Sequence, residues 1–174
     1  ASSYTTASIT PSSTVLTSVS QFVRDDGPPT AAIVIIGEAP GTYERLRGQP
    51  FVGPAGQKLS EWLEHAGLER SACYVTNVYP YQPPRNDLSA IPRDELATWI
   101  DRLHDRLAAL ADPIVLVPTG NIALRALIGK NLITRHRGSI YAYTDRRQRV
   151  IKVIPTIHPA AIFRQPAWES RCRR

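Results

Sequence analysis

Apolar and polar positions along the chain form two alternating kinds of segment. Short apolar runs rich in β-branched residues indicate buried strands over residues 31–36, 73–78, 113–117, 139–143 and 150–157. Apolar residues at helical spacing indicate helices over residues 56–65, 94–110 and 121–128, with a last short helix from residue 160. Strands that alternate with helices predict an α/β fold, in which a parallel sheet lies between layers of helices.

Polar side chains stand where the predicted strands end. Glu38 follows the first strand, Asn77 closes the second with Asn86 shortly after it, and His158 follows the last. Parallel sheets bind their ligands at the carboxyl ends of the strands. We therefore expect these side chains to face one crevice.

The N-terminal part of the chain differs from the rest in composition. Residues 1–20 hold twelve Ser or Thr and no charged residue, and a loop containing two prolines precedes the first buried strand. We predict a Ser/Thr-rich segment or linker over residues 1–28 and one domain over residues 29–174. Methionine is absent, even at position 1, which fits either a processed protein or a domain taken from a longer one. No apolar run approaches the length of a membrane span.

Charge is unevenly distributed along the chain, whose formal net charge is +6. Residues 121–174 carry twelve Lys or Arg against two acidic residues, whereas residues 1–120 carry nine against thirteen. A basic third on a near-neutral body fits a protein that binds a polyanion, and it equally fits a merely soluble basic surface. Composition leaves both interpretations open.

Several common catalytic motifs are missing from the sequence. It contains no phosphate loop, no dinucleotide-binding glycine motif, no GxSxG elbow and no HExxH pair. Its two cysteines, Cys73 and Cys172, are too few for a four-thiolate metal site and make a disulfide framework improbable. These observations disfavour nucleoside triphosphatases, dinucleotide oxidoreductases, serine hydrolases and zinc enzymes.

A series of motifs at the predicted strand ends resembles, in order, those of the uracil-DNA glycosylase superfamily, and family 4 most closely. The motifs are GEAPGTYE at 37–44, GQPFVGPAG at 48–56, TNV at 76–78, PPRN at 83–86 and HPAAIFR at 158–164. The resemblance implies a three-layer α/β/α fold with a central, mostly parallel, four-stranded sheet. It also implies a monofunctional DNA glycosylase that hydrolyses the N-glycosidic bond of flipped-out deoxyuridine and so starts base-excision repair.

The resemblance further implies where such a protein acts and on what. Its substrate is uracil-containing DNA, single- or double-stranded, and it has no membrane partner. We expect an intracellular monomer that meets DNA in the cell.

Four residues are candidates for holding the substrate. By resemblance Phe51 stacks on the flipped base, and Asn77 pairs with uracil N3–H and O4, since its amide offers one donor group and one acceptor. Ala39 and Gly41 of the first motif are placed with them in the uracil pocket. The alternatives are a core phenylalanine for Phe51 and a turn-capping asparagine for Asn77.

Four further residues are candidates for catalysis. The resemblance assigns His158 to donate a hydrogen bond to uracil O2 as negative charge develops there, while a purely structural histidine is the alternative. By resemblance Asn86 orients the attacking water, Glu44 shapes the pocket and Glu38 contributes local hydrogen bonds. The division of roles among Glu38, Glu44 and Asn86 stays open. Ala39 stands where some related families have Asp, and alanine cannot act as a base.

The last motif and the basic segment are candidates for DNA contact. Ile162 and Phe163 could wedge into the duplex while Arg164 meets a phosphate, or the two apolar residues could belong to the core of a last helix. Other cations that could neutralise phosphate, each of which could equally be solvated surface, are Arg135, Arg137, Arg146, Arg147, Arg149 and Lys152.

The chain departs from family 4 at the cysteines that hold its [4Fe–4S] cluster. The N-terminal segment has no cysteine, Tyr81 stands at the third ligand position, and the fourth falls near Thr98 and Trp99. We therefore expect no cofactor and no metal, with bulky packing in place of the cluster. Two other functions stay open: a catalytically silent DNA-binding module of a replication or repair assembly, and an unrelated α/β hydrolase acting on nucleotides.

Overall fold

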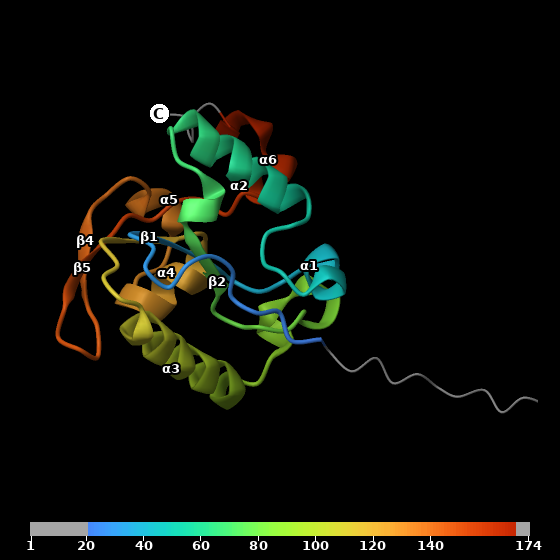
Figure 1. Ribbon diagram of the computed structural model, residues 1–174. Coiled ribbons are helices and arrows are strands. Elements are labelled where there is room, and N and C mark those ends of the chain that lie inside the picture. The colour runs from blue at the N-terminus through green and yellow to red at the C-terminus, as the bar shows by residue number, and fades with distance from the viewer. Residues whose placement is uncertain (1–20, 170–174) are drawn as a thin grey trace, which may run out of the picture.

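The buried apolar runs lie side by side in a single sheet. A computed structural model describes residues 21–169, and within that range the sheet has five strands in the order β2-β1-β3-β5-β4 (Figure 1). The strands are β1 (Ile33–Gly37), β2 (Tyr74–Asn77), β3 (Val115–Pro118), β4 (Tyr141–Thr144) and β5 (Val150–Val153). The first four in spatial order are parallel, so their carboxyl ends meet at one edge.

The expected α/β class and the mostly parallel sheet are confirmed, but the four-stranded sheet that the resemblance implies is corrected to five strands. The fifth strand is β4, which the apolar run over residues 139–143 predicts and which pairs antiparallel with β5 at the edge of the sheet. A short polar turn joins these two strands, and two strands connected so tightly can pair only in antiparallel fashion.

Helices cover both faces of the sheet, as expected for three layers. The longer ones are α2 (Pro54–His65), α3 (Arg93–Ala109) and α4 (Asn121–Ile128), and the short ones are α1 (Thr42–Arg47), α5 (Ile133–His136) and α6 (Ala161–Arg164). Single-turn helices of the 3₁₀ type are η1 (Arg70–Ala72), η2 (Pro84–Asn86), η3 (Leu88–Ala90) and η4 (Pro166–Trp168). None of these described helices is long and apolar enough to span a membrane.

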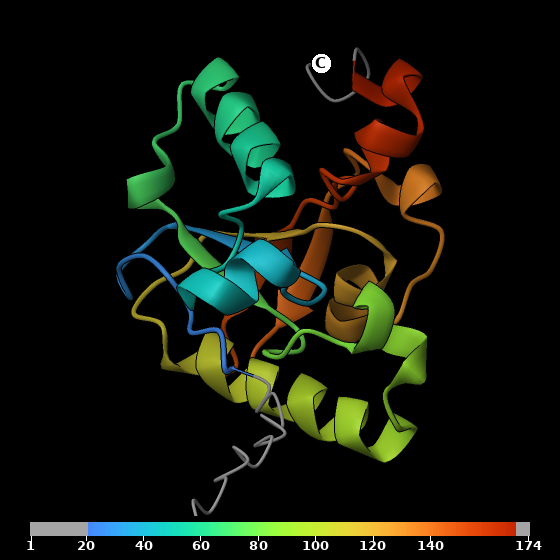
Figure 2. The ribbon, with the colours of Figure 1, turned by 90° about the vertical axis from the view of Figure 1, so that its right-hand side faces the viewer.

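Alternation along β1 decides which helix packs on which face. Val34 and Ile36 point into a core shared with α3 and α4, whereas Ile35, between them, joins a second core with Leu59 and Leu63 of α2. Successive side chains of a strand point to opposite faces, so one apolar run supplies both cores. Figure 2 shows the sheet between α3 on one side and α2 on the other.

Two short helices and the start of the described chain were not anticipated from the pattern. Helices α1 and α5 are too short for a helical repeat to show in the sequence. Before the first strand, Val23 is buried, and Asp26 and Val75 exchange two backbone hydrogen bonds of 2.9 and 2.7 Å. The Ser/Thr-rich residues 1–20 lie outside the described range.

Candidate functional site

A cavity of about 830 Å³ opens at the carboxyl edge of the parallel strands. It is lined by every residue proposed for substrate binding or catalysis, from separate parts of the chain: Glu38, Ala39, Gly41, Glu44, Phe51, Asn77, Asn86 and His158. Arg164 of the last motif also lines it. The crevice expected from the strand ends is therefore present, and the motifs converge on it.

The floor of the cavity depends on a close approach between two side chains at Gly37. A Cβ at this position would lie 2.2 Å from Asn77 Oδ1 and 2.7 Å from the Phe51 ring. Only a residue without a side chain lets the Asn77 amide and the Phe51 ring pack on the end of β1 at once. Gly37 therefore shapes the site without offering any functional group.

Phe51 forms one wall and is held in an unusual backbone conformation. Its φ is +52°, in the left-handed region, and its side chain is only 7% exposed. The ring lies roughly parallel to that of His158, with centroids 5.7 Å apart and an interplanar angle of 27°. Gly56 permits this turn, because a Cβ there would lie 1.7 Å from the Phe51 carbonyl oxygen.

Asn77 closes β2 with its backbone fixed and its side chain available. Arg106 of α3 donates from Nη2 to the Asn77 carbonyl oxygen at 2.9 Å and from Nη1 to Thr76 Oγ1 and Asp25 Oδ1. Asn77 is only 5% exposed, and it lines the cavity. A buried amide that borders a cavity is suited to pair with a ligand.

His158 is held as a neutral ring of defined tautomer. Its Nδ1 accepts a hydrogen bond of 3.2 Å from the backbone N–H of Ala160. Burial lowers the pKa of His158 to about 4, so the ring is neutral at pH 7. Since Nδ1 is the acceptor, the single ring proton is on Nε2, which is then a hydrogen-bond donor.

Glu44 joins the two parts of the first motif region. One carboxylate oxygen accepts the backbone N–H groups of Val52 and Gly53 at 3.0 and 2.8 Å, and the other accepts that of Gly41 at 3.0 Å. These three bonds use most of the accepting capacity of a buried carboxylate. Glu44 thereby holds the Phe51 loop against the GEAPG loop, which is a positioning role.

Glu38 points to the start of α4. Its Oε1 accepts the backbone N–H of Ile122 at 3.0 Å, and burial raises the pKa of this carboxyl group. Gly120 leaves room for the carboxylate, since a Cβ there would lie 2.4 Å from Oε1. Glu38 thus satisfies a helix N-terminus while it lines the cavity.

Asn86 lies at the open side of the cavity on a strained turn. Arg85 and Asn86 both have left-handed backbone angles, with φ of +54° and +57°. The Asn86 side chain is exposed, and its Oδ1 accepts a 2.8 Å hydrogen bond from Gln82 Nε2.

Comparison with known proteins shows the family of this chain. A family model described as "Uracil DNA glycosylase superfamily" matches residues 24–173. The chain belongs to the uracil DNA glycosylase superfamily. Membership makes it a DNA glycosylase, a class of hydrolases, and confirms the resemblance on which the site was predicted.

Individual relatives in the superfamily cover most of the chain. The type-4 uracil-DNA glycosylases of Archaeoglobus fulgidus and Thermotoga maritima are 35% and 36% identical to it, over 83% and 80% of this chain and 73% and 70% of theirs. A DNA polymerase of Bacillus phage SP01 is 30% identical over 84% of this chain, which corresponds to 15% of the polymerase.

The residues proposed for DNA contact differ in where the fold places them. Phe163 is 56% exposed beside the cavity residue Arg164, whereas Ile162 is 4% exposed and belongs to the core. Ile162 is therefore corrected from a wedge candidate to a packing residue, because α6 turns successive side chains to different sides. Arg135 is exposed on α5, and Arg137 directly follows that helix; neither lines the cavity.

Two other cations of the basic segment are engaged within the protein. Arg146 pairs with Asp101 and Asp105 of α3, and Arg149 pairs with Asp145 at 2.7 Å. These two were suggested as phosphate contacts, and their ion pairs instead tie the β4–β5 turn to itself and to α3.

Aromatic rings stand at or near the two cluster positions that the family 4 resemblance places within the described residues, whereas the N-terminal pair lies outside them. Tyr81 and Trp99 pack edge to face with centroids 5.7 Å apart, and Phe22 and Tyr79 each contact both rings at 5.6–6.3 Å. Cys73 is a free, buried core residue. Within the described range no group of His, Cys, Asp or Glu could hold a metal ion. These residues do not fit a thiolate-bound cluster.

Three arginines important to the site escaped the sequence analysis. Arg93 and Arg125 line the cavity, and Arg106 holds the end of β2. Each is an isolated cation on a helix, so no local pattern distinguishes it from a solvated surface residue.

Proposed function

We propose that this chain is a uracil-DNA glycosylase that flips deoxyuridine out of DNA and hydrolyses its N-glycosidic bond, leaving an abasic site. The observation that supports this most strongly is the convergence of the motif residues on one cavity at the strand ends. The named activity of the type-4 relatives points the same way.

Base recognition follows from Phe51 and Asn77. The Phe51 ring offers a face on which a flipped base stacks, an interaction worth about 1–3 kcal/mol. The Asn77 amide donates to uracil O4 through Nδ2 and accepts from N3–H through Oδ1. Cytosine presents the opposite donor and acceptor at these positions, so the same amide discriminates against it. The burial of Asn77 at the wall of the cavity, beside Phe51, supports this role.

Departure of the base is assisted by His158. As the bond between C1′ and N1 lengthens, the sugar becomes oxocarbenium-like and negative charge gathers on uracil O2. The Nε2–H of a neutral His158 donates to that oxygen without any proton transfer in the ground state. Its place beside Phe51 puts this donor next to the stacking surface.

Water attack is assigned to Asn86. Because an oxocarbenium-like centre reacts readily with water, an amide that orients the water can suffice without a strong base. Ala39 offers no base, and the hydrogen bonds of Glu44 and Glu38 to backbone N–H groups favour positioning roles for both. Glu44 then places the Phe51 loop, and Glu38 places the start of α4.

DNA is held at the mouth of the cavity. Phe163 is proposed to enter the space left by the flipped base, and Arg164 to contact a neighbouring phosphate. The exposed position of Phe163 beside a cavity residue supports this. The abasic product is a starting point for base-excision repair.

An oligonucleotide release assay tests the proposal. Purified protein is incubated with single- and double-stranded oligonucleotides that contain uracil, hypoxanthine or only normal bases, and alkali then reveals abasic sites. Release of uracil is expected, with Asn77→Ala and His158→Ala each slower by at least about 100-fold while DNA affinity changes little. A folded protein that releases no uracil would contradict the proposal.

A catalytically silent DNA-binding module is the second candidate, and the match to part of a phage DNA polymerase favours it. The same assay separates the two, since a silent module binds the oligonucleotides and leaves them intact. Activity on free deoxyuridine without activity on DNA would instead indicate a nucleotide hydrolase.

A further inference from the structure

We propose that Gln82 is a positioning residue that orients the Asn86 amide toward the attacking water. This inference rests on the proposed glycosylase function and adds a residue that none of the sequence motifs includes. Gln82 lies on the loop between β2 and η2, between the Asn77 and Asn86 motifs.

Three hydrogen bonds hold the Gln82 side chain. Its Nε2 donates to Asn86 Oδ1 at 2.8 Å and to Thr42 Oγ1 at 3.0 Å, and its Oε1 accepts from Arg45 Nε at 2.8 Å. Thr42 and Arg45 belong to α1, so the Gln82 amide connects α1 to the Asn86 turn.

The arginine determines which way the Gln82 amide faces. A guanidinium can only donate, so the end of the amide toward Arg45 must be the oxygen, and the NH₂ group must face Asn86. A reversed amide would set two donors against each other at Arg45. The orientation of Gln82 is therefore determined by chemistry as well as by distance.

The fixed NH₂ group in turn determines the orientation of Asn86. The Asn86 side chain is exposed, and the last torsion of an asparagine has two broadly populated orientations of similar energy. Only Oδ1 can accept from Gln82, so Nδ2 is turned to the opposite side. One lone pair of Oδ1 remains to accept a hydrogen bond from water, in an orientation that thermal rotation would otherwise average.

The same bonds couple two motifs that must meet around the substrate. The GEAPG loop leads directly into α1, which carries Thr42 and Arg45, while Asn86 follows the second strand. Gln82 bridges these segments across about 40 positions of the chain. Its loss should therefore affect the chemical step more than the binding of DNA.

The variant Gln82→Glu tests the proposal because it keeps the shape and removes the donor. The carboxylate still accepts from Arg45, but it cannot donate to Asn86 and it repels Oδ1. We expect the single-turnover rate of uracil release to fall about 10- to 100-fold. Gln82→Met is neutral and also lacks the donor, so it should give a similar loss of rate. A loss in both variants cannot then be explained by repulsion between an added negative charge and DNA. Thr42→Val removes a different bond of Gln82 and keeps the one to Asn86, so it should cause a smaller loss than either Gln82 variant.

A double-mutant cycle distinguishes positioning from a general structural role. In an Asn86→Ala background, Gln82→Glu should cause no further loss of rate, since its effect passes through the missing amide. Additive losses, or an unchanged rate in both single Gln82 variants with the fold intact by thermal denaturation, would overturn the inference. A wild-type protein that releases no uracil would instead count against the proposed function itself.

Discussion

At the scale of single residues, neighbouring groups fix the orientation of the side chains in the site. Asn77 and Phe51 pack over a glycine hydrogen, and the ring proton of His158 is directed to Nε2 by the Ala160 N–H. Glu44 has its carboxylate occupied by three backbone donors. Such preorganisation lowers the cost of reaching the transition state, because little has to rearrange when charge develops.

The close approach at Gly37 gives a sharp test at this scale. Gly37→Ala places a methyl group 2.2 Å from Asn77 Oδ1 and 2.7 Å from the Phe51 ring, so one of them must move. We expect uracil release to slow by about 100-fold while the protein still folds, since displacements of about 1 Å have effects of this size. Single-turnover kinetics measure the loss.

Gly67→Ala is the matched control for that substitution. Position 67 has open space around it, but its φ is +70°. The cost should therefore appear as about 1 kcal/mol of unfolding free energy, with the rate unchanged. A Gly37→Ala protein of normal activity would show that the floor of the cavity can accommodate an added methyl group.

The pH response of His158 follows from its lowered pKa. The folded state holds this pKa at about 4, whereas an unfolded histidine titrates near 6.5, so the unfolded chain binds more protons between these values. The stability that His158 contributes is present above about pH 6.5 and is lost as the pH falls toward 4. The melting temperature should therefore decline more steeply over this window for the wild type than for His158→Gln. Equal slopes for the two proteins would show that His158 has the same pKa in the folded and unfolded states.

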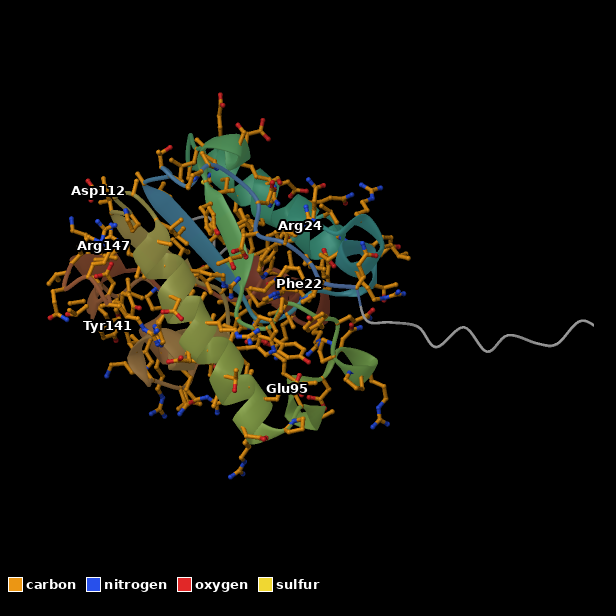
Figure 3. The ribbon with its side chains drawn as sticks, turned by 60° about the horizontal axis from the view of Figure 1, so that its bottom comes forward. Phe22, Arg24, Glu95, Asp112, Tyr141 and Arg147 are labelled. Carbon is orange, nitrogen blue, oxygen red and sulfur yellow. The ribbon has the colours of Figure 1, made fainter. Side chains whose placement is uncertain are left out.

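At the scale of elements, α3 is the part of the fold that joins the site to the core. Its apolar face packs Leu103 and Leu107 on the sheet, and its Arg106 holds the carbonyl group of Asn77. In its first half, Trp99 contacts the rings of Tyr79 and Tyr81. Phe22, from the first described residues, lies on this side of the molecule above Glu95 of α3 (Figure 3). Aromatic packing in this chain thus joins α3 to the loop after β2 and to the first described residues.

Truncation of Trp99 tests that element. Trp99→Ala removes ring contacts to Phe22, Tyr79 and Tyr81, and we expect a loss of about 2–3 kcal/mol in unfolding free energy, less than for a fully buried tryptophan. Urea denaturation measures this, and exposed Thr98→Ala should change stability by less than about 0.5 kcal/mol.

Prolonged treatment with a chelator should alter neither stability nor activity, because aromatic packing joins these segments. A rate of uracil release that depends on iron would contradict this.

At the scale of the whole molecule, the positive charge is divided between two regions. Arg93, Arg125 and Arg164 surround the cavity. Arg146 and Arg149 form ion pairs at the β4–β5 turn, and Figure 3 shows Arg147 at the opposite end of α3 from Glu95. The excess of cations in residues 121–174 is thus only partly directed to the site, and charge at the cavity should govern DNA affinity.

A matched pair of charge removals tests this division. Arg164→Gln and Arg146→Gln each remove one positive charge, but only Arg164 lines the cavity. We expect Arg164→Gln to weaken DNA binding and to reduce the slope of log affinity against log salt by about 1, with no such change for Arg146→Gln. Fluorescence anisotropy over a salt series measures both, and equal effects would indicate that DNA contacts a wider surface.

The strands, the longer helices and the motif residues that line the cavity could be predicted from the amino-acid sequence alone. Continuous apolar runs specify strands buried on both faces, and a parallel sheet must bring the ends of such strands to one edge. Glu38, Asn77 and His158 could therefore be placed together without coordinates, and Tyr81 and Cys73 could be recognised as departures from the cluster-bearing family.

Which groups each side chain contacts could be seen only in the three-dimensional fold. It placed Ile162 in the core and Phe163 outside, turned Glu44 to three backbone donors, and set Gln82 between Arg45 and Asn86. These outcomes depend on contacts between distant parts of the chain and on the hand of very short helices. Local periodicity carries no information about either, because it records only which positions are buried and not which partner they meet.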